Sequence, residues 1–301
     1  MKNKFAVSIL NKYHEKRASS MAGKVALLCD KNKTKAVCFA YYNAFYRFPN
    51  LSNPKTINEK LQVLKLNQYY NNDIITTCVD KVLVKDYLKK QGYGDLCAQT
   101  YWVGDNFGSV DFDSLPEQFV IKCNHGCGYN LFVGNKDRID REEVEKTVLQ
   151  WMDEDCWKIY AEFQYQFVEK KILIEQYLGD RIKTYKFYCF NGVPKVVYCS
   201  QADEEGNADR YLDYYDLKWN HLDIHLGEHP WNPIPVVRPC CLEKMIEIAN
   251  ELCKPFPFVR VDLYEIEGKV FFSEFTFEPT GGYMQLYPSS VALEWGEWLK
   301  I

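Results

Sequence analysis

The sequence contains no long apolar run. No stretch of its 301 residues approaches the roughly 18–20 consecutive apolar residues that a membrane-spanning helix needs. The N-terminal stretch MKNKFAVSILNKYHEKRASS has an apolar patch too short for the hydrophobic region of a signal peptide. These absences predict a cytoplasmic protein.

Several familiar motifs are missing as well. No G-x-S-x-G nucleophile motif occurs in the sequence, so no Ser-His-Asp triad of the hydrolase kind is expected. The G-x-x-x-x-G-K-[ST] loop is also absent, and no strand–Gly loop–helix with a dinucleotide fingerprint is found. Because no nucleic-acid-binding motif occurs either, we expect no nucleic-acid partner.

The twelve cysteines lack the regular spacing of a disulfide framework. A chain of this size does not need such cross-links, so we expect reduced cysteines that mostly lie in the core. Cys123, His125 and Cys127 are close enough in sequence to suggest zinc. No second ligand pair has zinc-finger spacing, and Cys240 and Cys241 are adjacent, so the zinc interpretation is disfavoured.

Charge is distributed unevenly along the chain. Residues 1–56 hold eleven Lys or Arg against two acidic residues, a net charge of +9. The remaining residues therefore carry a net charge of −13, which gives the overall −4. A basic segment on an acidic body is typical of a protein that contacts an anionic membrane surface or glycan. A basic surface that simply faces solvent explains the same pattern, and both interpretations stay open.

Local patterns predict several helices. The segment TINE at 56–59 is a capping box, which opens a helix inside 52–70. We expect a second helix to start at Asp80. Helical periodicity or acidic first turns predict further helices over 140–157 and 240–254.

Strands are predicted by apolar runs and turn residues. KILIEQYL at 171–178 is typical of a buried strand. The pair Asn191-Gly192, between two apolar segments, is the strongest short hairpin signal. A longer hairpin is expected over 258–277, whereas the composition of 92–118 favours loops.

This order of elements favours an α+β fold. No internal repeat or flexible linker divides the chain. A helical start is followed by a small α+β segment and a larger, sheet-rich end. We therefore expect three domains, over residues 1–115, 116–178 and 179–301.

The segment FVIKCNHGCGYNLFV, residues 119–133, places a Gly-rich loop between two apolar runs. A strand–loop–strand of this kind offers backbone N–H groups that can fold over phosphates as a flap. Lys122, directly before the loop, adds a positive charge. Taken alone, a plain turn beside a surface lysine explains the segment equally well.

The hairpin over 258–277 carries polar residues on one face. With a three-residue turn over 266–268, Arg260 pairs with Glu274, and four side chains share that face: Arg260, Asp262, Glu274 and Thr276. The opposite face is then apolar and belongs in the core: Val259, Val261, Leu263, Phe271, Phe275 and Phe277. Two neighbouring carboxylates favour Mg²⁺, which prefers one or two carboxylates together with phosphate oxygens. An Arg260–Glu274 ion pair is the structural alternative.

A different turn would change this arrangement. A two-residue turn at Glu267-Gly268 would pair Asp262 with Ser273 and move Glu274 to the opposite face. Because that register would mix phenylalanines with Arg260 and Asp262, we expect the two carboxylates on the same face.

Together, these segments resemble the ATP-grasp enzymes and, within them, the TupA-like ATP-grasp family of bacterial surface-polysaccharide gene clusters. The resemblance covers roughly residues 50–301 and rests on TINEKLQVLKL, VDKVLVKDYL, FVIKCNHGCGYN, ILIEQYL, YKFYCFNGVPK, YYDLKWN, FPFVRVDLYE and SEFTFEPTGG. It implies an ATP-grasp fold of the α+β class, with two lobes that clasp ATP and a mainly helical region before them.

The resemblance also implies the nucleotide contacts. Lys81 and Lys122 match the two lysines that contact the phosphates. The flap residues assigned to the nucleotide are Asn124, His125, Gly126 and Gly128. The strand that supplies the adenine hinge corresponds to Glu175, Gln176, Tyr177 and Leu178.

In the terminal hairpin, Asp262 and Glu274 match the metal carboxylates, which implies one or two Mg²⁺ ions with the ATP. Arg260 matches the arginine that steadies the acyl phosphate and the tetrahedral oxyanion, and Lys186 would lie near the phosphates or the acceptor. Thr276 departs from the asparagine that many ATP-grasp enzymes have at this position. A hydroxyl is a weaker metal ligand, so the number of ions stays open, and Glu278 is close enough in sequence to compensate.

The activity implied by this family is ATP-dependent ligation of a carboxylate to an amine through an acyl phosphate. The expected partners are a carboxylate-bearing sugar or capsular glycan, such as a uronic acid, and an amine. Three alternatives stay open: a glycosyltransferase, a glycan kinase, and a non-catalytic nucleotide-binding protein.

Overall fold

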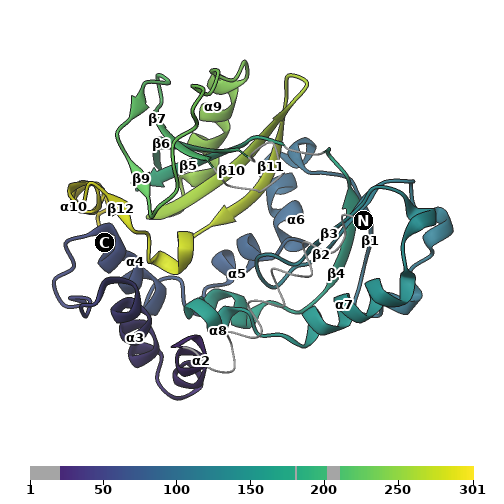
Figure 1. The fold of residues 1–301 in the computed structure, drawn as a ribbon, viewed down its shortest axis with the longest axis horizontal. Helices are drawn as coiled ribbons and strands as arrows, with labels where there is room; N and C mark the ends of the chain where they lie inside the picture. The colour runs from purple at the N-terminus through teal and green to yellow at the C-terminus, as the bar shows by residue number, and fades with distance from the viewer. Residues whose placement is uncertain (1–20, 180–181, 202–210) are drawn as a thin grey trace. The chain divides into compact units, whose positions relative to one another are not determined.

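The computed structural model describes residues 21–179, 182–201 and 211–301. The chain divides into two compact units, and each unit draws on three chain segments. Unit 1 takes the residues up to Pro49, Lys65–Val82 and Gln99–Tyr177; unit 2 takes Asn50–Leu64, Leu83–Ala98 and Leu178–Ile301. Each combines helices with an antiparallel sheet (Figure 1). The α+β class is therefore confirmed, whereas the three consecutive domains stay a prediction.

Unit 1 is built on a four-stranded sheet with the order β1-β4-β2-β3. The strands are β1 (Thr100–Gly104), β2 (Phe119–Cys123), β3 (Asn130–Val133) and β4 (Ile172–Gln176). Their apolar side chains share a core with Val144, Val148 and Trp151 of α7 (Arg141–Asp153). The carboxylate of Asp140 caps α7 by accepting two backbone N–H bonds, so the helix expected there is confirmed.

Short helices complete unit 1. They are α2 (Met21–Lys31), α3 (Lys33–Phe45), α5 (Asp73–Val79), α8 (Trp157–Tyr160), and the 3₁₀ turns η2 (Phe107–Ser109), η3 (Phe112–Ser114), η4 (Lys136–Arg138) and η5 (Phe163–Phe167). The stretch 92–118 is loop-rich as expected, but it also contains β1, whose partly exposed pattern gave no clear strand signal.

Unit 2 is built on a six-stranded sheet with the order β11-β10-β5-β6-β7-β8. The strands are β5 (Thr184–Phe190), β6 (Val193–Gln201), β7 (Tyr211–Asp216), β8 (His221–Leu222), β10 (Phe258–Ile266) and β11 (Lys269–Thr276). The hairpin expected at Asn191-Gly192 joins β5 to β6, and both turn residues have positive φ. A separate two-stranded sheet pairs β9 (His225–Leu226) with β12 (Leu286–Tyr287).

The helices of unit 2 are α4 (Ile57–Leu66), which begins in this unit, α6 (Leu83–Lys90), α9 (Leu242–Cys253) and α10 (Ser290–Trp298), with 3₁₀ turns η1 (Gly94–Leu96) and η6 (Pro279–Gly282). The capping box of α4 is confirmed, because Thr56 and Glu59 exchange backbone-to-side-chain hydrogen bonds. The helix expected to start at Asp80 starts at Leu83. The carboxylate of Asp80 accepts from the N–H of Val82 at 2.7 Å, which holds a turn there.

Helices cover the apolar face of the six-stranded sheet. The ring of Tyr87 in α6 lies 6.2 Å from that of Phe275, and α9 packs against the same side of β5 and β10, next to the hairpin (Figure 1). On the other face, Trp295 of α10 lies 4.9 Å from Tyr188. This leaves the polar residues of β10 and β11 on the face opposite α6 and α9.

The β10–β11 turn differs from the expected one. Ile266 pairs with Lys269, so the turn has two residues, Glu267 and Gly268, both with positive φ. The three-residue turn and the Arg260–Glu274 pairing were therefore wrong. A bulge beyond Asp262 then adds one residue to β11, and Asp262 pairs directly with Glu274.

The bulge preserves the shared face. Since it restores the alternation that a two-residue turn would otherwise shift, Asp262 and Glu274 still project from one side. Their common face is confirmed. Phe271, expected on the apolar side, instead pairs with Tyr264 on the polar side, and Phe272 takes its place opposite Leu263.

Candidate active site

Three charged side chains form a row across the six-stranded sheet of unit 2. Asp262 of β10 pairs with Lys186 of β5 on one side and with Glu274 of β11 on the other. Directly paired residues of neighbouring strands project from the same face, so the row is fixed by the sheet itself.

A second row lies one step along the strands. Here Arg260 pairs with Tyr188 of β5 and with Thr276 of β11. Alternate residues of a strand share a face, so this row projects on the same side as Lys186, Asp262 and Glu274. The sheet thus brings together all five residues that the sequence assigned to metal binding or catalysis in the hairpin and β5.

Arg260 is the centre of the contacts between these rows. Its Nε and Nη2 donate to the two carboxylate oxygens of Asp262 at 2.7 and 2.6 Å. Nη2 also donates to Thr276 Oγ1 at 2.9 Å and lies 3.6 Å from Glu274 Oε1. The Thr276 hydroxyl in turn donates to Glu274 at 3.3 Å. The guanidinium is therefore held by three neighbours at once.

Burial and charge act in opposite directions on this pair. Burial raises the pKa of Asp262, and the Arg260 guanidinium opposes that rise. Burial lowers the pKa of Arg260, but the attraction of Asp262 outweighs it and holds the pKa well above its ordinary value. Arg260 is consequently a permanent positive charge fixed on this face of the sheet.

The donor set fits a magnesium ion. Asp262 and Glu274 are direct partners in an antiparallel pair, which places their Cα atoms about 4.5–5.5 Å apart. Each carboxylate has roughly four lone-pair positions, more than Arg260 and Thr276 occupy. Glu274 is also accessible, with 39% of its side chain exposed, whereas Asp262 has 1%. The hydroxyl of Thr276, which was expected as a metal ligand, hydrogen-bonds to Arg260 and Glu274. Glu278, two residues further along the chain, is buried.

Lys186 lies in the interior of the sheet, because β6 follows β5 and Tyr198 of β6 is the direct partner of Lys186. Its ammonium stands 5.2 Å from the ring centroid of Tyr198, which is within the range of a cation–π contact. Tyr188 was missed in the sequence. It hydrogen-bonds Arg260, and its position two residues after Lys186 in YKFY was the signal that placed it on the same face.

In unit 1 the flap is confirmed as a strand–loop–strand, because β2 and β3 pair on either side of the glycine loop. Lys122 at its base forms an ion pair with Glu175 of β4, and the exposed fractions of the two side chains are 24 and 9%. Two residues assigned to different parts of ATP, the phosphates and the adenine, thus contact each other.

Lys81 is the second lysine at the flap. Its ammonium donates to the backbone carbonyl of Gly126. Gly126 has no room for a side chain, because a Cβ there would lie 1.9 Å from Cys156 Sγ. Gly128 has a φ of +81°, which only glycine adopts readily. The two glycines therefore shape the loop that Lys81 contacts.

Asn124 and His125 have structural contacts. The Asn124 side chain is fully buried, donates to Glu169 O and accepts from the N–H of Lys171, at 2.9 and 2.7 Å. His125 Nε2 donates to Trp151 O at 3.0 Å. Burial, with the nearby charge of Lys170, lowers the pKa of His125 to about 4, so it is neutral at pH 7. Its side chain does not provide a positive charge for phosphate.

The hinge residues are arranged along and just beyond β4. The Gln176 side-chain oxygen accepts from the backbone N–H of Gln99 at 3.3 Å, and the backbone N–H of Gln176 donates to Gln99 O. The ring of Tyr177 lies edge-on to Phe132 of β3, at 6.3 Å. Leu178 is the first residue of unit 2's last segment. The backbone beyond β4 is thus the place where unit 1 ends.

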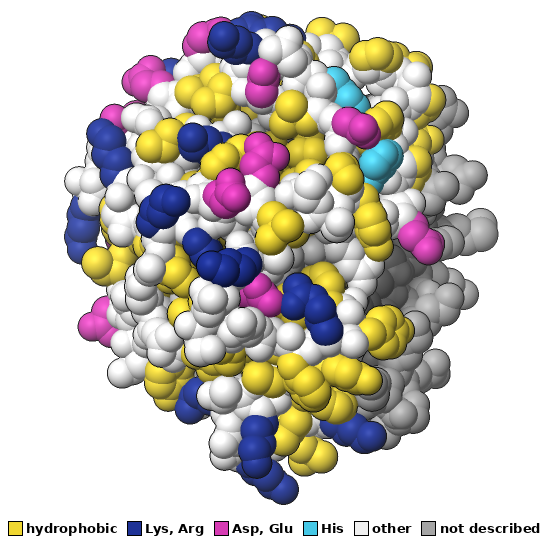
Figure 2. All heavy atoms as spheres, turned by 90° about the vertical axis from the view of Figure 1, so that its left-hand side faces the viewer, with side chains coloured by type: hydrophobic (Ala, Val, Ile, Leu, Met, Phe, Trp, Pro, Cys, Tyr) yellow, Lys and Arg dark blue, Asp and Glu magenta, His cyan; other side chains and the backbone are white. Residues whose placement is uncertain are grey.

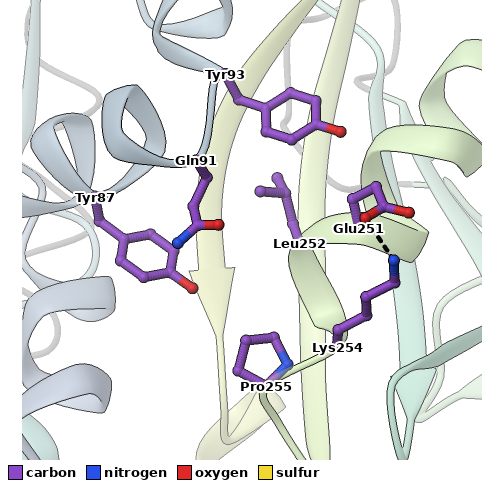
Figure 3. Close-up of a pocket in the computed structure, with 7 residues that line it drawn as sticks. All are labelled: Tyr87, Gln91, Tyr93, Glu251, Leu252, Lys254 and Pro255. Carbon is purple, nitrogen blue, oxygen red and sulfur yellow. Dashed lines mark hydrogen bonds and ion pairs between the residues drawn. The ribbon is translucent and has the colours of Figure 1, made fainter.

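A cavity of about 240 Å³ lies elsewhere in unit 2. It is lined by Tyr87, Gln91, Tyr93, Glu251, Leu252, Lys254 and Pro255, with an ion pair of 2.5 Å between Glu251 and Lys254 (Figure 3). Tyr87 belongs to α6 and Leu252 to α9, the helices that cover the apolar face of the sheet. The cavity is therefore not part of the polar face that carries Asp262.

Solved structures with similar folds include several ligases. The D-alanine–D-alanine ligase from Helicobacter pylori is 14% identical (TM-score 0.43), and the match covers 81% of this chain and 69% of that one. The L-amino acid ligase from Bacillus licheniformis is 13% identical (TM-score 0.44), and the match covers 80% of this chain and 54% of that one. The ATP complex of the D-alanine–D-alanine ligase from Bacillus anthracis is 14% identical (TM-score 0.41), and the match covers 67% of this chain and 57% of that one. This chain thus spans less than two thirds of the latter two.

No curated protein matches the sequence. Within the described residues, no helix has the length and apolar character needed to cross a membrane. The family model for TupA-like ATPgrasp matches residues 59–300, which include the flap, the hinge strand and the terminal hairpin. The chain belongs to the TupA-like ATP-grasp family and has its fold.

Proposed function

We propose that this protein is an ATP-dependent ligase that joins a carboxylate to an amine. The observation that carries the proposal is the row of Lys186, Asp262 and Glu274 with Arg260 beside it, on one face of the sheet. It combines two hard oxygen donors with two positive charges. Membership of the ATP-grasp family supports ATP as the substrate.

The reaction would proceed in two transfers. A carboxylate oxygen of the acceptor attacks the γ-phosphorus of ATP and ADP leaves; the amine nitrogen then attacks the acyl carbon, and phosphate leaves as the nitrogen loses a proton. Such chemistry depends on positioning and charge neutralisation rather than on a side-chain nucleophile. This agrees with the absence of a nucleophile motif.

Each residue has a role in this scheme. Asp262 and Glu274 would hold Mg²⁺, which neutralises phosphate charge when bound. Arg260, fixed by its ion pair, would stabilise the negative oxygens of the acyl phosphate and of the tetrahedral intermediate. Lys186 would orient the acceptor carboxylate or the phosphates.

The remaining roles fall to unit 1. Lys81 and Lys122 would contact the phosphates, beneath the flap backbone at Gly126 and Gly128. The chain at 175–178 would bind the adenine through backbone groups. In the free protein Lys122 pairs with Glu175, so ATP would compete with that carboxylate for the lysine.

The acceptor in this proposal is a uronic or amino acid carboxylate of a surface polysaccharide or its precursor. Measuring ADP release from ATP and Mg²⁺ against a panel of uronic and amino acids, each with and without amines, tests it. A ligase releases ADP in proportion to product only when both substrates are present. Release with the sugar alone would identify a kinase, and ATP binding without release would identify a binding protein.

The basic N-terminal region is the second part of the proposal, as a contact with an anionic membrane surface. Residues 1–20 of this region lie outside the described residues. In α2 and α3 and directly after them, large apolar side chains are exposed: Leu27 at 63%, Tyr46 at 84% and Phe48 at 66%. Lys24, Lys31 and Lys35 are also exposed. In Figure 2, the lowest part of the face turned to the viewer carries hydrophobic and basic side chains and no acidic ones.

This composition suits a lipid surface. Aromatic side chains favour the interface between headgroups and acyl chains, and each basic residue near an anionic surface adds about 1 kcal/mol of attraction. Tyr42 and Phe48 stack at 5.1 Å, which joins two of the exposed rings into one patch.

A further inference from the structure

Cys240 and Cys241 lie directly before α9, beside the end of the β10–β11 hairpin. The Cys240 thiol donates to Glu265 Oε1 at 2.6 Å, and the Cys241 thiol donates to the carbonyl of Gly268 at 3.2 Å. Two segments separated by more than 20 residues therefore place two sulfurs, a carboxylate and a carbonyl oxygen together. None of these groups has a role in the proposed ligase.

The spacing of these atoms suits a tetrahedral metal ion. The two sulfurs are 3.9 Å apart, and two sulfurs bound to zinc at about 2.3 Å each are separated by about 3.8 Å in a tetrahedral site. The sulfurs and the nearest Glu265 oxygen all lie within 4.8 Å of one another. Among the described residues, this is the one group of three His, Cys, Asp or Glu side chains with such spacing.

The site is also accessible. Cys240 is exposed, Cys241 and Glu265 are partly exposed, and the cluster lies at the surface end of the hairpin. Binding would replace the two thiol protons, which leave to solvent, and the Glu265 carboxylate would turn from the Cys240 thiol to the metal. A water molecule or the Gly268 carbonyl would complete four ligands.

We propose that Cys240, Cys241 and Glu265 form a zinc site that fixes the end of the β10–β11 hairpin to the start of α9. From the sequence, zinc was considered at Cys123, His125 and Cys127 and disfavoured, because no second pair has finger spacing and Cys240 and Cys241 are adjacent. The missing ligand comes instead from the hairpin, which the fold brings alongside. Since the same hairpin carries Asp262 and Glu274, zinc here would stiffen the strands of the active site from the opposite face.

A vicinal disulfide is the competing chemistry for these sulfurs. It would need an oxidant and a thiolate to react with it, because the thiolate is the reactive form. Cys240 and Cys241 are both free thiols in the structure, so metal binding is tested on the reduced protein.

Cobalt replaces zinc as a visible probe of this site. Titration of the reduced, metal-free protein with Co²⁺ should give the near-ultraviolet charge-transfer band of sulfur ligands, saturating at one ion per chain and abolished by competing zinc. Cobalt at Asp262 and Glu274 would give no such band, because those ligands are oxygens.

Variants distinguish the cluster from other cysteines. Cys240→Ser and Cys241→Ser should each weaken binding at least tenfold and remove most of the band, and Glu265→Gln should weaken binding with the band retained. Cys127→Ser, at the other exposed cysteine, should bind cobalt as the unchanged protein does. Zinc should raise the melting temperature of the unchanged protein but not of Cys241→Ser. No sulfur band in the unchanged protein, or a band that survives both serine variants, overturns the proposal.

Discussion

The Asp262 carboxylate is held in place by Arg260, the other residue of β10 that is assigned to the proposed active site. Its two oxygens accept from Arg260, and its side chain is 1% exposed. Removing one of two neighbouring carboxylates usually relieves repulsion between like charges. Because Arg260 contacts both Asp262 and Glu274, their repulsion is already offset by its positive charge. The two carboxylates differ in how closely they pair with Arg260, at 2.6 Å for Asp262 and 3.6 Å for Glu274.

Asp262→Asn and Glu274→Gln should therefore separate activity from stability. Both should abolish ADP release, since each removes a proposed metal ligand. Asp262→Asn should also destabilise the fold by about 3 kcal/mol, because it leaves a buried arginine poorly paired. Glu274→Gln should cost less than about 1 kcal/mol, because its ion pair is long and partly solvated. Urea unfolding measures both, and equal destabilisation would contradict this account of Arg260.

His125 gives unit 1 a pH-dependent stability. Its pKa is about 4 in the folded chain because it is buried, against about 6.5 when unfolded. The unfolded chain binds more protons between these values, so this contribution is complete above pH 6.5 and is lost as the pH falls towards 4.

His125→Gln should remove this dependence. Between pH 7.5 and 4.5 the unchanged protein should lose on the order of 2 kcal/mol more stability than the variant. Urea unfolding of both proteins at the two pH values measures the difference, in which the other titrating groups cancel. Parallel losses would mean that His125 is protonated without penalty and is not buried as described.

At the scale of elements, local signals were sufficient where one short segment determines the structure. The capping box at Thr56 and Glu59 and the turn at Asn191-Gly192 both form as expected. The predicted length of the β10–β11 turn was wrong, because the strand register depends on two features at once, the turn length and a bulge. A two-residue turn and a bulge shift the alternation in opposite senses, and only the pairing of β11 with β10 reveals the second.

The flap illustrates a different limit. Its sequence predicted the strand–loop–strand, but it did not show that Asn124 and His125 would be used to anchor the loop. Their partners, Glu169 O and Trp151 O, are backbone carbonyls, which leave no signature in a sequence. The residue types alone were compatible with phosphate contacts.

Lys122→Ala should weaken binding of ATP with Mg²⁺ at least tenfold. Loss of a charge-assisted contact to phosphate costs roughly 1.5–3 kcal/mol, and the variant also leaves Glu175, which is 9% exposed, without its lysine. Lys171→Ala is the matched control, because that lysine pairs with the exposed Glu169 at the start of β4. Calorimetry should give unchanged affinity for the control. Equal affinity for both variants would remove Lys122 from the nucleotide site.

At the scale of the whole molecule, the sequence shows an uneven distribution of charge but does not indicate what the basic region contacts. The net +9 of residues 1–56 was equally consistent with a solvated surface. The exposed rings of Tyr46 and Phe48 favour a contact, since basic residues beside exposed aromatics are typical of membrane-binding surfaces. Deleting the whole region is not a clean test, because Val37 and Tyr41 of α3 are fully buried.

Point variants test the membrane contact instead. The full chain should bind vesicles of phosphatidylcholine with phosphatidylserine, and the affinity should fall steeply with salt, because exposed charges are screened beyond roughly 8–10 Å at physiological ionic strength. Tyr46→Ser with Phe48→Ser, and separately Lys31→Glu with Lys35→Glu, should each reduce binding at least tenfold. Ile234→Ser with Val237→Ser, at side chains exposed by 74 and 77%, should have no effect. Sedimentation with the vesicles measures this, and binding that ignores salt, or that the control pair reduces equally, would assign the basic region to solvent.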